Sequence, residues 1–547
     1  MAKPLAMIRS GGVSMKRIWT VALAVLLAVP VSFTMAVAAP QPGGTLVYAL
    51  RDEPDRLDPN LSGLRPSQIV FFQIFDPLIV RDKTDKKFKP WLATSWTVSP
   101  DGTVYTFKLR QGVKFHDGTP FDAAAVKFNF DRTHNPSLAS RCGGCAVGFY
   151  DHAQVVDPST VKIYLKRSWA PFLDAASLYY RMVSPAGVKQ YGDQDFGRHP
   201  VGSGPFKFVE WIPNDHITLE RYGDYQWPAP ILRHSGPAYV ERVIIRMLPE
   251  DSTRVAALEN GEVQVIDNAP AQDFDRLTKD SRFKALVGFV PGVPFDFAIN
   301  VTKPPTDELA VRQALSYGLD RPTIVKTVFG PFAKVGAFLP AYGLLTPYTY
   351  GYDKSADVYR FDPAKARTLL DDAGWKVGPD GIRQKAGKRL IIPVGSWEHG
   401  VPEVMQAQLK QIGIDLRLFI ATGTAIQTVN ENQRKAVTLM SPLPAPRSDP
   451  DIVSAFLHSR NVGGGGFNFS FVSDPALDRL LDAQAVEVNE VKRAQILSEA
   501  QHMVMEKAYM VAVYNWDNIS LKSSKVNDLE FDSIGFFPWL HDAWLSP

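Results

Sequence analysis

The sequence predicts an α/β protein of two or three domains that follows an N-terminal export signal. Three observations carry this prediction. The first 38 residues have the pattern of a secretory leader. Removing 38 residues from 547 leaves 509, which is more than one hydrophobic core accommodates. The second half of the chain repeats a helix–glycine–strand unit, which is typical of α/β architecture.

The leader is recognised by the order of its parts. Lys16 and Arg17 precede an apolar run over residues 18–29, and the segment ends in Ala36-Val37-Ala38. A basic start, a short apolar run and an A-x-A site describe a signal peptide over residues 1–38. The run is too short to cross a bilayer about 30 Å thick. We therefore expect cleavage after Ala38 and an exported protein.

The charge balance depends on this leader. The first 38 residues contain four basic residues and no acidic one, so 60 less 4 leaves 56 basic residues against 57 acidic ones. The basic excess thus belongs to the export signal and gives no support to nucleic-acid binding.

The first half of the chain reads as strands and turns. Alternation over residues 45–50 predicts a strand, and residues 99–102 supply the turn of a β-hairpin. Farther on, Thr119 is expected to cap a helix whose capping box includes Asp122. His116, just before this cap, is interpreted as a turn residue rather than a catalyst, because no partner geometry is implied.

The second half supplies the α/β units. Residues 307–321 predict a helix, and Asp362 caps a second helix that Gly374 ends. A third helix closes at Gly413 and leads into an alternating strand. Helices over about 474–507 precede an aromatic strand.

Two cysteines stand together in the stretch RCGGC. In an oxidising compartment the default prediction is a local disulfide between Cys142 and Cys145. A redox dithiol lacks its usual βαβ context. A zinc site with His134 and His152 can be drawn, but the spacings are irregular. We therefore predict no metal site.

Catalytic signatures are missing from the sequence. It contains no G-x-S-x-G elbow, H-E-x-x-H pair or GxxxxGK[ST] loop, and the four glycines at 463–466 predict a loop rather than a phosphate cradle. Two-carboxylate glycosidase chemistry stays open, because such a pair need not be close in sequence.

Ordered blocks along the chain resemble one known family. They include GGTLVYALRDEPDRLDP, KPWLATSWTVSPDGTVYTFKLRQGVKFHDGTPFDAAAVKFNFDR, PVGSGPFKFVEW, AALENGEVQVID, TKPPTDELAVRQALSYGLDR, QAQLKQIGIDLRL and SDPDIVSAFLHS. Together these blocks resemble the bacterial extracellular solute-binding proteins of the oligopeptide, dipeptide and nickel type, family 5. These proteins are the substrate receptors of ABC importers.

The resemblance implies a two-lobed periplasmic-binding-protein fold with three domains and a hinged interlobe cleft. Domain I would comprise 39–75, 197–290 and 518–547, domain II would be inserted at 76–196, and domain III would span 291–517. No enzymatic activity and no cofactor are implied. The expected partners are a small solute or short peptide and the permease subunits with their ATPases, and the protein is expected to be a monomer.

The resemblance also identifies a ligand-facing segment, LPAPRSDPD. Peptide-binding relatives place an aspartate four residues before the proline of its Asp-Pro step, here Pro450, and that aspartate pairs with the α-ammonium of the peptide. Here that position is Pro446, and Arg447 follows it. This difference favours an anionic or amino-blocked ligand, since arginine offers paired donors to carboxylate or phosphate. The alternative is that Arg447 is a solvated loop residue.

Five further positions are expected to face the cleft by the same resemblance: Leu64, Arg65, Leu443, Asn515 and Trp516. The functional hypothesis is a periplasmic receptor that captures a peptide or peptide-like solute for ABC import. The alternatives are a receptor for a non-peptide anionic solute, a sensor-coupled receptor and a secreted hydrolase. A nickel complex is also left open, although no convergent histidine set is visible. No cysteine stands at the cleavage site, so a lipid anchor is not expected.

Overall fold

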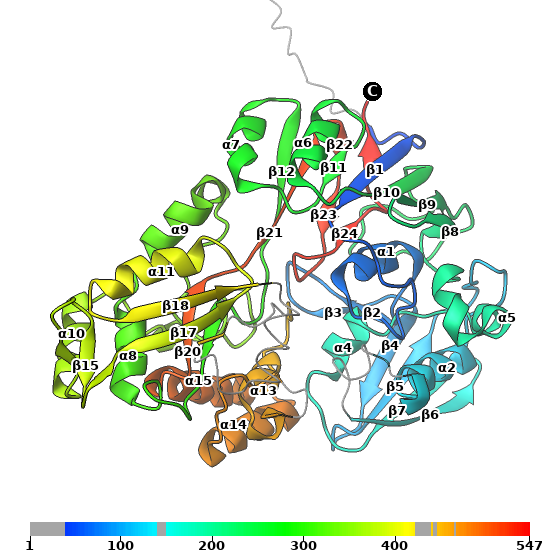
Figure 1. Ribbon diagram of the computed structural model, residues 1–547. Helices are drawn as coiled ribbons and strands as arrows, with labels where there is room; N and C mark the ends of the chain where they lie inside the picture. Colours follow the sequence, from blue (N-terminus) through cyan, green and yellow to red (C-terminus); the bar gives the residue numbers. More distant parts are fainter. Residues whose placement is uncertain (1–38, 139, 141–148, 422–438, 441–445, 464–466) are drawn as a thin grey trace, which may run out of the picture. The chain divides into compact units, whose positions relative to one another are not determined.

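The computed structural model describes residues 39–138, 140, 149–421, 439–440, 446–463 and 467–547, and Figure 1 labels its helices and strands. Its three largest sheets have seven, five and four strands. Each is described below with the helices that pack near it.

The seven-stranded sheet contains both early and late parts of the chain, coloured blue and red in Figure 1. Its strand order is β12-β21-β11-β1-β10-β9-β8. The strand predicted over residues 45–50 is confirmed as β1, which pairs in parallel with β10 and β11. The strands are β1 (Thr45–Leu50), β8 (Phe206–Ile212), β9 (His216–Arg221), β10 (Arg242–Met247), β11 (Val265–Ile266), β12 (Phe283–Gly288) and β21 (Asn518–Ser523).

Helices and short strands complete this region. Helices α1, α6 and α7 belong to it, and the last residues of the chain form small two-stranded ladders. Their bounds are α1 (Arg65–Ile74), α6 (Asp251–Glu259), α7 (Ala271–Lys279), β2 (Ile79–Arg81), β3 (Phe88–Pro90), β22 (Val526–Asn527), β23 (Glu530–Phe531), β24 (Pro538–Trp539) and β25 (Trp544–Leu545).

The four-stranded sheet has the order β4-β5-β7-β6, and its first pair is the predicted hairpin. The amide of Gly102 donates to the carbonyl of Ser99 at 2.9 Å, and the φ of Gly102 is 70°, so glycine suits this turn. The elements are β4 (Ala93–Val98), β5 (Val104–Leu109), β6 (Tyr150–Asp157), β7 (Thr160–Leu165), α2 (Ala123–Thr133), α4 (Phe172–Leu178) and α5 (Pro185–Asp195).

Helix α2 begins later than the sequence suggests. Its N-cap is Asp122, whose carboxylate accepts the amide of Ala125 at 2.9 Å, and not Thr119. The prediction was wrong because Lys114 and Pro120 form a β-bridge that keeps the intervening segment out of the helix. An aspartate cap is as favourable as the predicted threonine.

His116 stabilises the turn before this helix. Its amide donates to the carbonyl of Gly202 at 2.8 Å, and its Nε2 donates to the carbonyl of Gly204 at 2.9 Å. Burial lowers the pKa of His116 to about 4, so the ring is neutral at pH 7. His116 therefore fastens the 202–204 segment, in line with its interpretation as a turn residue.

The five-stranded sheet has the order β18-β17-β19-β13-β20. Asp362 caps α10 and Gly374 follows its end with a φ of 85°, as predicted. Gly413, also as predicted, separates α11 from β18. The elements are β13 (Phe295–Ile299), β17 (Ile391–Ser396), β18 (Asp415–Ile420), β19 (Leu439–Met440), β20 (Met510–Tyr514), α8 (Leu309–Tyr317), α9 (Arg321–Phe329), α10 (Pro363–Asp372) and α11 (Val401–Lys410).

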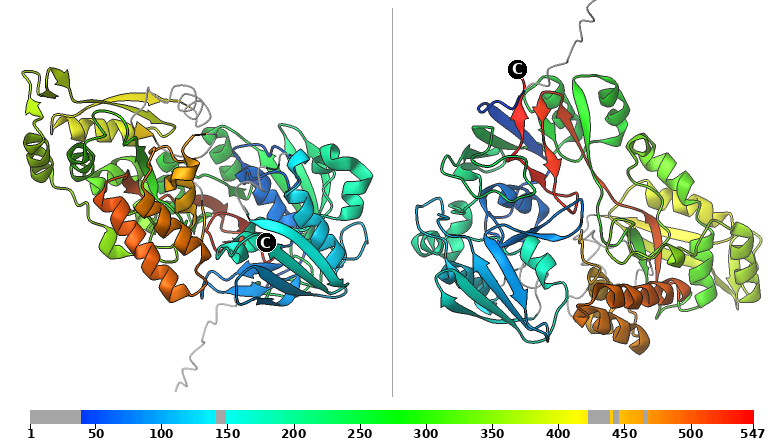
Figure 2. Two further views of the ribbon diagram at one scale, coloured as in Figure 1. Left: turned by 90° about the horizontal axis from the view of Figure 1, so that it is seen from below. Right: turned by 180° about the vertical axis from the view of Figure 1, so that it is seen from behind.

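Three further helices lie near this sheet, and a small three-stranded ladder follows α10. Helices α14 and α15, orange in Figure 2, pack side by side. The bounds are α13 (Ile452–Leu457), α14 (Pro475–Val486), α15 (Glu490–Glu506), β14 (Lys376–Val377), β15 (Arg383–Lys385) and β16 (Lys388–Arg389).

The chain passes twice between the seven-stranded and five-stranded sheets. One passage joins β12 to β13 and the other joins β20 to β21. β12 pairs with β21 and β13 pairs with β20, both antiparallel. The two passages therefore begin and end on paired strands.

The glycines of the PVGSGPF block test how tightly this fold packs. A Cβ on Gly202 would lie 2.1 Å from the carbonyl oxygen of Ile74, which is a backbone atom at the end of α1. We expect Gly202→Ala to lower the free energy of unfolding by about 1–3 kcal/mol, the usual effect of overpacking. Urea unfolding measures it. Gly223→Ala is the matched control, since nothing lies within 4 Å of its Cβ position. Equal stabilities would contradict the packing.

Candidate functional site

The segment that resembles the family's ligand-facing loop touches the region of the four-stranded sheet. The amide of Arg447 donates to the carbonyl of Pro291 at 3.2 Å, and its guanidinium lies over the ring of Tyr179 at 4.1 Å. Pro446 and Arg447 are both half-buried. Arg447 is thus packed on an aromatic ring and also reaches solvent.

The next residue extends this contact. The hydroxyl of Ser448 donates to the carboxylate of Asp174 on α4, and Nε of Arg81 lies 3.3 Å from the same carboxylate. Burial raises the pKa of Asp174, Arg81 and Ser448 oppose that rise, and the charge of nearby Asp449 adds to it.

Further polar contacts join the same two stretches of chain. Nε1 of Trp169 donates to Asp451 at 3.2 Å, and the amide of Ala170 donates to the carbonyl of Ala485 at 2.8 Å. We call the contact of residues 168–179 with 447–451 and 485–486 the interdomain contact, because the domain limits expected from the resemblance would place these stretches in different domains. Its described hydrogen bonds come from two side chains, those of Ser448 and Trp169, and from the backbone amide of Ala170.

Asp449 is held differently from Asp174. Arg493 on α15 donates to both of its oxygens at 2.6 and 2.7 Å. Burial would raise the pKa of Asp449, but the charge and hydrogen bonds of Arg493 outweigh burial and lower it. Arg493 thus anchors the SDPD motif from within the same part of the chain. Ser448 of the motif instead bonds to Asp174.

Arg65, which was predicted to face the cleft, forms an ion pair with Asp267 inside the protein. It is the first residue of α1, and its guanidinium donates to both oxygens of Asp267 at 2.5 and 2.9 Å. It also lies 4.4 Å over the ring of Phe536. The neighbouring Leu64 is the N-cap and is 41% exposed. Asp267 therefore neutralises Arg65, which makes Arg65 a poor anion-binding residue.

Asn515 and Trp516 lie in the passage from β20 to β21. The amide of Asn515 donates to the carbonyl of Leu339 at 2.7 Å. None of the described residues donates to its buried side-chain oxygen. Trp516 packs edge-on against Phe536, with ring centroids 5.2 Å apart. Phe536 thus brings Arg65 and Trp516 together.

Three predicted residues fall in parts of the chain that the structure leaves undescribed. Leu443 and the cysteines Cys142 and Cys145 lie outside the described residues. The predicted disulfide and the expected contact of Leu443 with ligand therefore stay predictions.

Asp517 links the two passages and was missed by sequence reasoning. Its carboxylate accepts the amide of Val290, in the other passage, at 3.1 Å and the amide of Phe338 at 2.9 Å. Burial raises the pKa of Asp517 to about 7, and the two amides only partly oppose that rise. In the sequence it is one acidic residue after an aromatic strand, and nothing there indicates this role.

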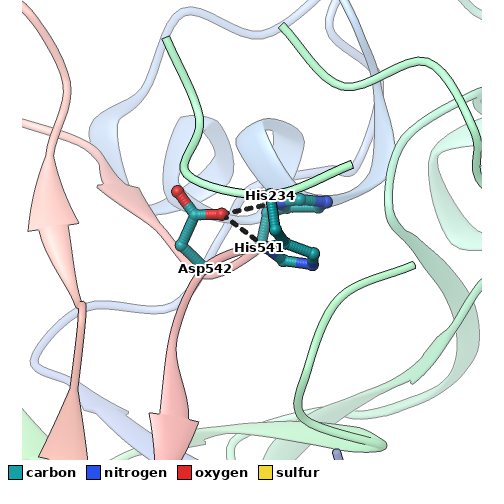
Figure 3. A group of neighbouring side chains, drawn as sticks. All are labelled: His234, His541 and Asp542. Carbon is teal, nitrogen blue, oxygen red and sulfur yellow. Dashed lines mark hydrogen bonds and ion pairs between the residues drawn. The ribbon is translucent and has the colours of Figure 1, made fainter. Parts of the chain in front are cut away.

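One group of side chains within the described residues could in principle hold a metal ion: His234, His541 and Asp542 (Figure 3). Nδ1 of each ring lies 2.8–2.9 Å from the same oxygen of Asp542. Nε2 of each ring donates to a backbone carbonyl, of Pro237 and of Gly236.

The rings do not suit a metal. Their centroids are 4.2 Å apart and their planes differ by 18°, so the two rings are stacked. A metal must lie close to the plane of every imidazole that binds it, and no point does so for two stacked rings at bonding distance. The group instead ties the C-terminal segment to the loop at 233–237, since Asp542 also accepts the amide of Arg233 at 2.8 Å.

Within the described ranges, every helix is too short or too polar to cross a bilayer.

Comparison with known proteins decides the family. Residues 87–464 match the middle part of the bacterial extracellular solute-binding proteins, family 5. The chain belongs to this family. The glutathione-binding protein GsiB of Salmonella typhi is 32% identical over 473 residues, which cover 85% of this chain and 87% of that protein. GsiB of Escherichia coli O157:H7 is 30% identical over 474 residues, with the same two coverages.

Solved structures have the same fold. NikA from Brucella suis, in complex with Fe(III)-EDTA, superposes with a TM-score of 0.80 at 26% identity and covers 92% of this chain and 100% of its own. The oligopeptide-binding protein AppA from Bacillus subtilis, in complex with a nonapeptide, gives 0.75 at 23% identity, with coverages of 93% and 100%.

These findings confirm the family, the two-lobed α/β fold and the function that the resemblance implied. The protein is a solute-binding protein of ABC import, and its relatives are binding proteins, among them the periplasmic binding protein DppA from Helicobacter pylori. The domain limits and the ligand-contacting residues stay predictions.

The buried pairing of Arg65 predicts a loss of stability on mutation. Removing one partner of a buried ion pair lowers the free energy of unfolding by about 3 kcal/mol or more, and we expect this of Arg65→Ala. Denaturant unfolding measures it. Arg417→Ala is the control, since Arg417 is 64% exposed beside Asp415 and should change stability by less than about 1 kcal/mol. Unchanged stability of Arg65→Ala together with lost solute binding would make Arg65 a ligand contact instead.

Asp517 predicts a pH dependence of stability. Its folded pKa of about 7 exceeds the unfolded value of 3.8, so the folded state holds the proton more tightly between these values. The free energy of unfolding should therefore fall as pH rises from about 4 to 7, through this residue by a few kcal/mol at most. Asp517→Asn should flatten that slope, measured as the difference between the two proteins. Parallel pH profiles would contradict the shift.

Proposed function

We propose that this protein is exported by cleavage after Ala38, works as a monomer in the periplasm, and captures one peptide-like solute between its lobes for permease subunits and their ATPases. The observation that carries the proposal is the 32% identity to a glutathione-binding protein over 85% of the chain. The predicted limits at 75, 196, 290 and 517 assign residues 168–179 to domain II and residues 447–451 to domain III. In this division the interdomain contact crosses the cleft.

The proposed solute is an acidic, peptide-like molecule of about the size of glutathione. Glutathione carries two carboxylates and one ammonium group. Arg447 offers a partly exposed guanidinium beside the interdomain contact, and arginine binds carboxylates through paired donors. The position that carries an ammonium-binding aspartate in peptide-binding relatives is Pro446 here. Arg447 is therefore proposed as a carboxylate contact, with Leu64, Leu443, Asn515 and Trp516 as further cleft residues.

A non-peptide anionic solute is the second candidate, and Pro446 is the observation that favours it. Such a solute needs no ammonium partner, so the exchange of aspartate for proline would have no consequence for it. The secreted-hydrolase alternative differs in one observable respect, because it requires turnover of the captured molecule.

Native mass spectrometry of the periplasmic protein tests the proposal directly. We expect a one-to-one complex with an acidic solute, which denaturation releases intact for identification. A mixture of neutral or basic peptides would exclude the acidic ligand class. Cleaved fragments that accumulate with time would favour the hydrolase, and a protein without captured solute that binds neither glutathione nor other acidic peptides would remove the peptide-like ligand class.

Arg447→Ala tests the proposed contact with carboxylate. A charge-assisted hydrogen bond contributes about 1.5–3 kcal/mol, so we expect the affinity for glutathione, measured by calorimetry, to fall about 10- to 100-fold. Arg417→Ala serves as the control, because Arg417 is an exposed surface residue of β18. Equal affinities of wild type and Arg447→Ala would show that Arg447 does not contact the solute.

A further inference from the structure

Strand β13 contains one charged residue within an apolar run. All five of its residues are buried, and β13 lies between β19 and β20 in the five-stranded sheet. Phe295, Phe297 and Ile299 pack into one core together with Tyr514. Asp296 and Ala298 alternate with them and line a cavity instead. Asp296 is only 6% exposed.

The carboxylate of Asp296 differs from the other buried acids of the chain. Asp174, Asp449 and Asp517 each accept hydrogen bonds. Within the described residues, no side chain or amide of another residue donates to Asp296, and no cation pairs with it. Burial raises the pKa of Asp296 to about 8, with no charged neighbour among the causes. A buried acid without a partner is unfavourable, so its presence needs an explanation.

The cavity is small and largely apolar. Its cavity volume is about 10 Å³, which is room for about one water-sized group. Besides Asp296, the only polar side chain in its described lining is Ser470, whose hydroxyl already donates to the carbonyl of Tyr509 at 3.0 Å. The remaining lining residues are apolar or aromatic: Val293, Ala298, Leu344, Val453, Phe456, Leu457, Phe467 and Met510.

The cavity lies next to the proposed ligand-binding segment. Val453, Phe456 and Leu457 of its lining belong to α13, which follows directly on residues 447–451 of the interdomain contact. Phe467 is 40% exposed and its ring meets Phe456 edge-on, with centroids 6.2 Å apart. Through Phe467 the lining extends to the surface.

We propose that Asp296 and this cavity form a subsite for a primary ammonium group of the captured solute. An ammonium group is about the size of a water molecule, it supplies the opposite charge, and it donates the hydrogen bonds that the carboxylate lacks. Aromatic faces in the lining favour a cation. The inference rests on the proposed function, and it places an ammonium partner on β13 in a chain that has proline at position 446.

Other occupants fit the cavity less well. An anion would be repelled by the carboxylate of Asp296, because the apolar lining screens the two charges poorly. A calcium ion takes six to eight oxygen ligands, whereas the described lining offers Asp296 and the hydroxyl of Ser470. A guanidinium group is larger than the accessible space. A primary ammonium group is therefore the group whose size and charge both match.

The test uses methylammonium as the probe, so that it does not depend on the identity of the solute. We expect methylammonium chloride to raise the melting temperature of the wild type above that in equal sodium chloride, and to lose this effect in Asp296→Asn. Asp307→Asn is the control, since Asp307 is exposed on the surface. Asp296→Asn replaces an unpaired acid by a neutral group of the same shape, so its melting temperature without probe should be at least that of wild type. Equal methylammonium effects in the two proteins, or none in the wild type, would overturn the subsite.

A pH series sharpens the same test. The probe requires an ionised Asp296, so its stabilising effect should fall severalfold as pH is lowered from about 8.5 to 6.5. No other titratable side chain lines the cavity in the described part of the chain. An effect independent of pH would contradict the role of Asp296.

A comparison of solutes separates this inference from the proposed function. If glutathione binds, its N-acetyl derivative should bind at least tenfold more weakly to wild type and about equally weakly to Asp296→Asn. Captured solute without an amine would overturn the subsite and leave the receptor function standing. A methylammonium effect in a protein that binds no acidic peptide would overturn the ligand class and leave the subsite standing.

Discussion

The arrangement of this protein depends on the pair of passages that join its two large sheets. Because β12 pairs with β21 and β13 with β20, the two passages run between strands that are fixed to each other at both ends. Asp517 in one passage accepts the amide of Val290 in the other. Such a paired connection resists sliding and permits rotation, which is the motion that a hinged receptor requires.

The chemistry of the interdomain contact suits a reversible closure. Its described hydrogen bonds run from Ser448 to Asp174, from Trp169 to Asp451 and from Ala170 to Ala485. Polar groups of this kind exchange protein partners for water with a small net free energy. The apolar part of the contact includes Ala485, which belongs to the same buried cluster as Trp169. Closure can therefore be governed by the solute, which must favour the closed state to shift the population.

The sequence predicted those features that depend on local signals. The strand at β1, the cap at Asp362 and the ends marked by Gly374 and Gly413 follow from patterns within a few residues, and the structure confirms them. The start of α2 was misjudged by three residues, because the bridge between Lys114 and Pro120 extends the preceding turn. The family resemblance supplied the fold and the function. Local patterns alone would have predicted only the α/β class.

The site was less predictable, because its electrostatics depend on residues far apart in the chain. Arg65 and Arg447 are the same residue type in similarly polar loops. Arg65 meets Asp267, which lies 202 residues away, whereas Arg447 packs on an aromatic ring. The same reasoning separates the buried acids. An aspartate in an apolar stretch indicates a special role. Only the packed structure distinguishes a hydrogen-bonded Asp517 from Asp296, to which none of the described residues donates.

Asp296 also shows how a residue that suits binding of a solute can lower the stability of the empty protein. Every other buried aspartate considered above gains donors from its own chain, and those donors reduce the unfavourable effect of its burial. At Asp296 the cavity leaves room for a donor from outside, so the folded protein lacks an interaction that a solute can supply. A donor from the solute is stabilised at such a site only in the conformation of the protein that encloses it. In the proposed subsite, recognition of the solute would therefore be coupled to closure of the lobes, because the carboxyl group of Asp296 gains its donor only from the solute.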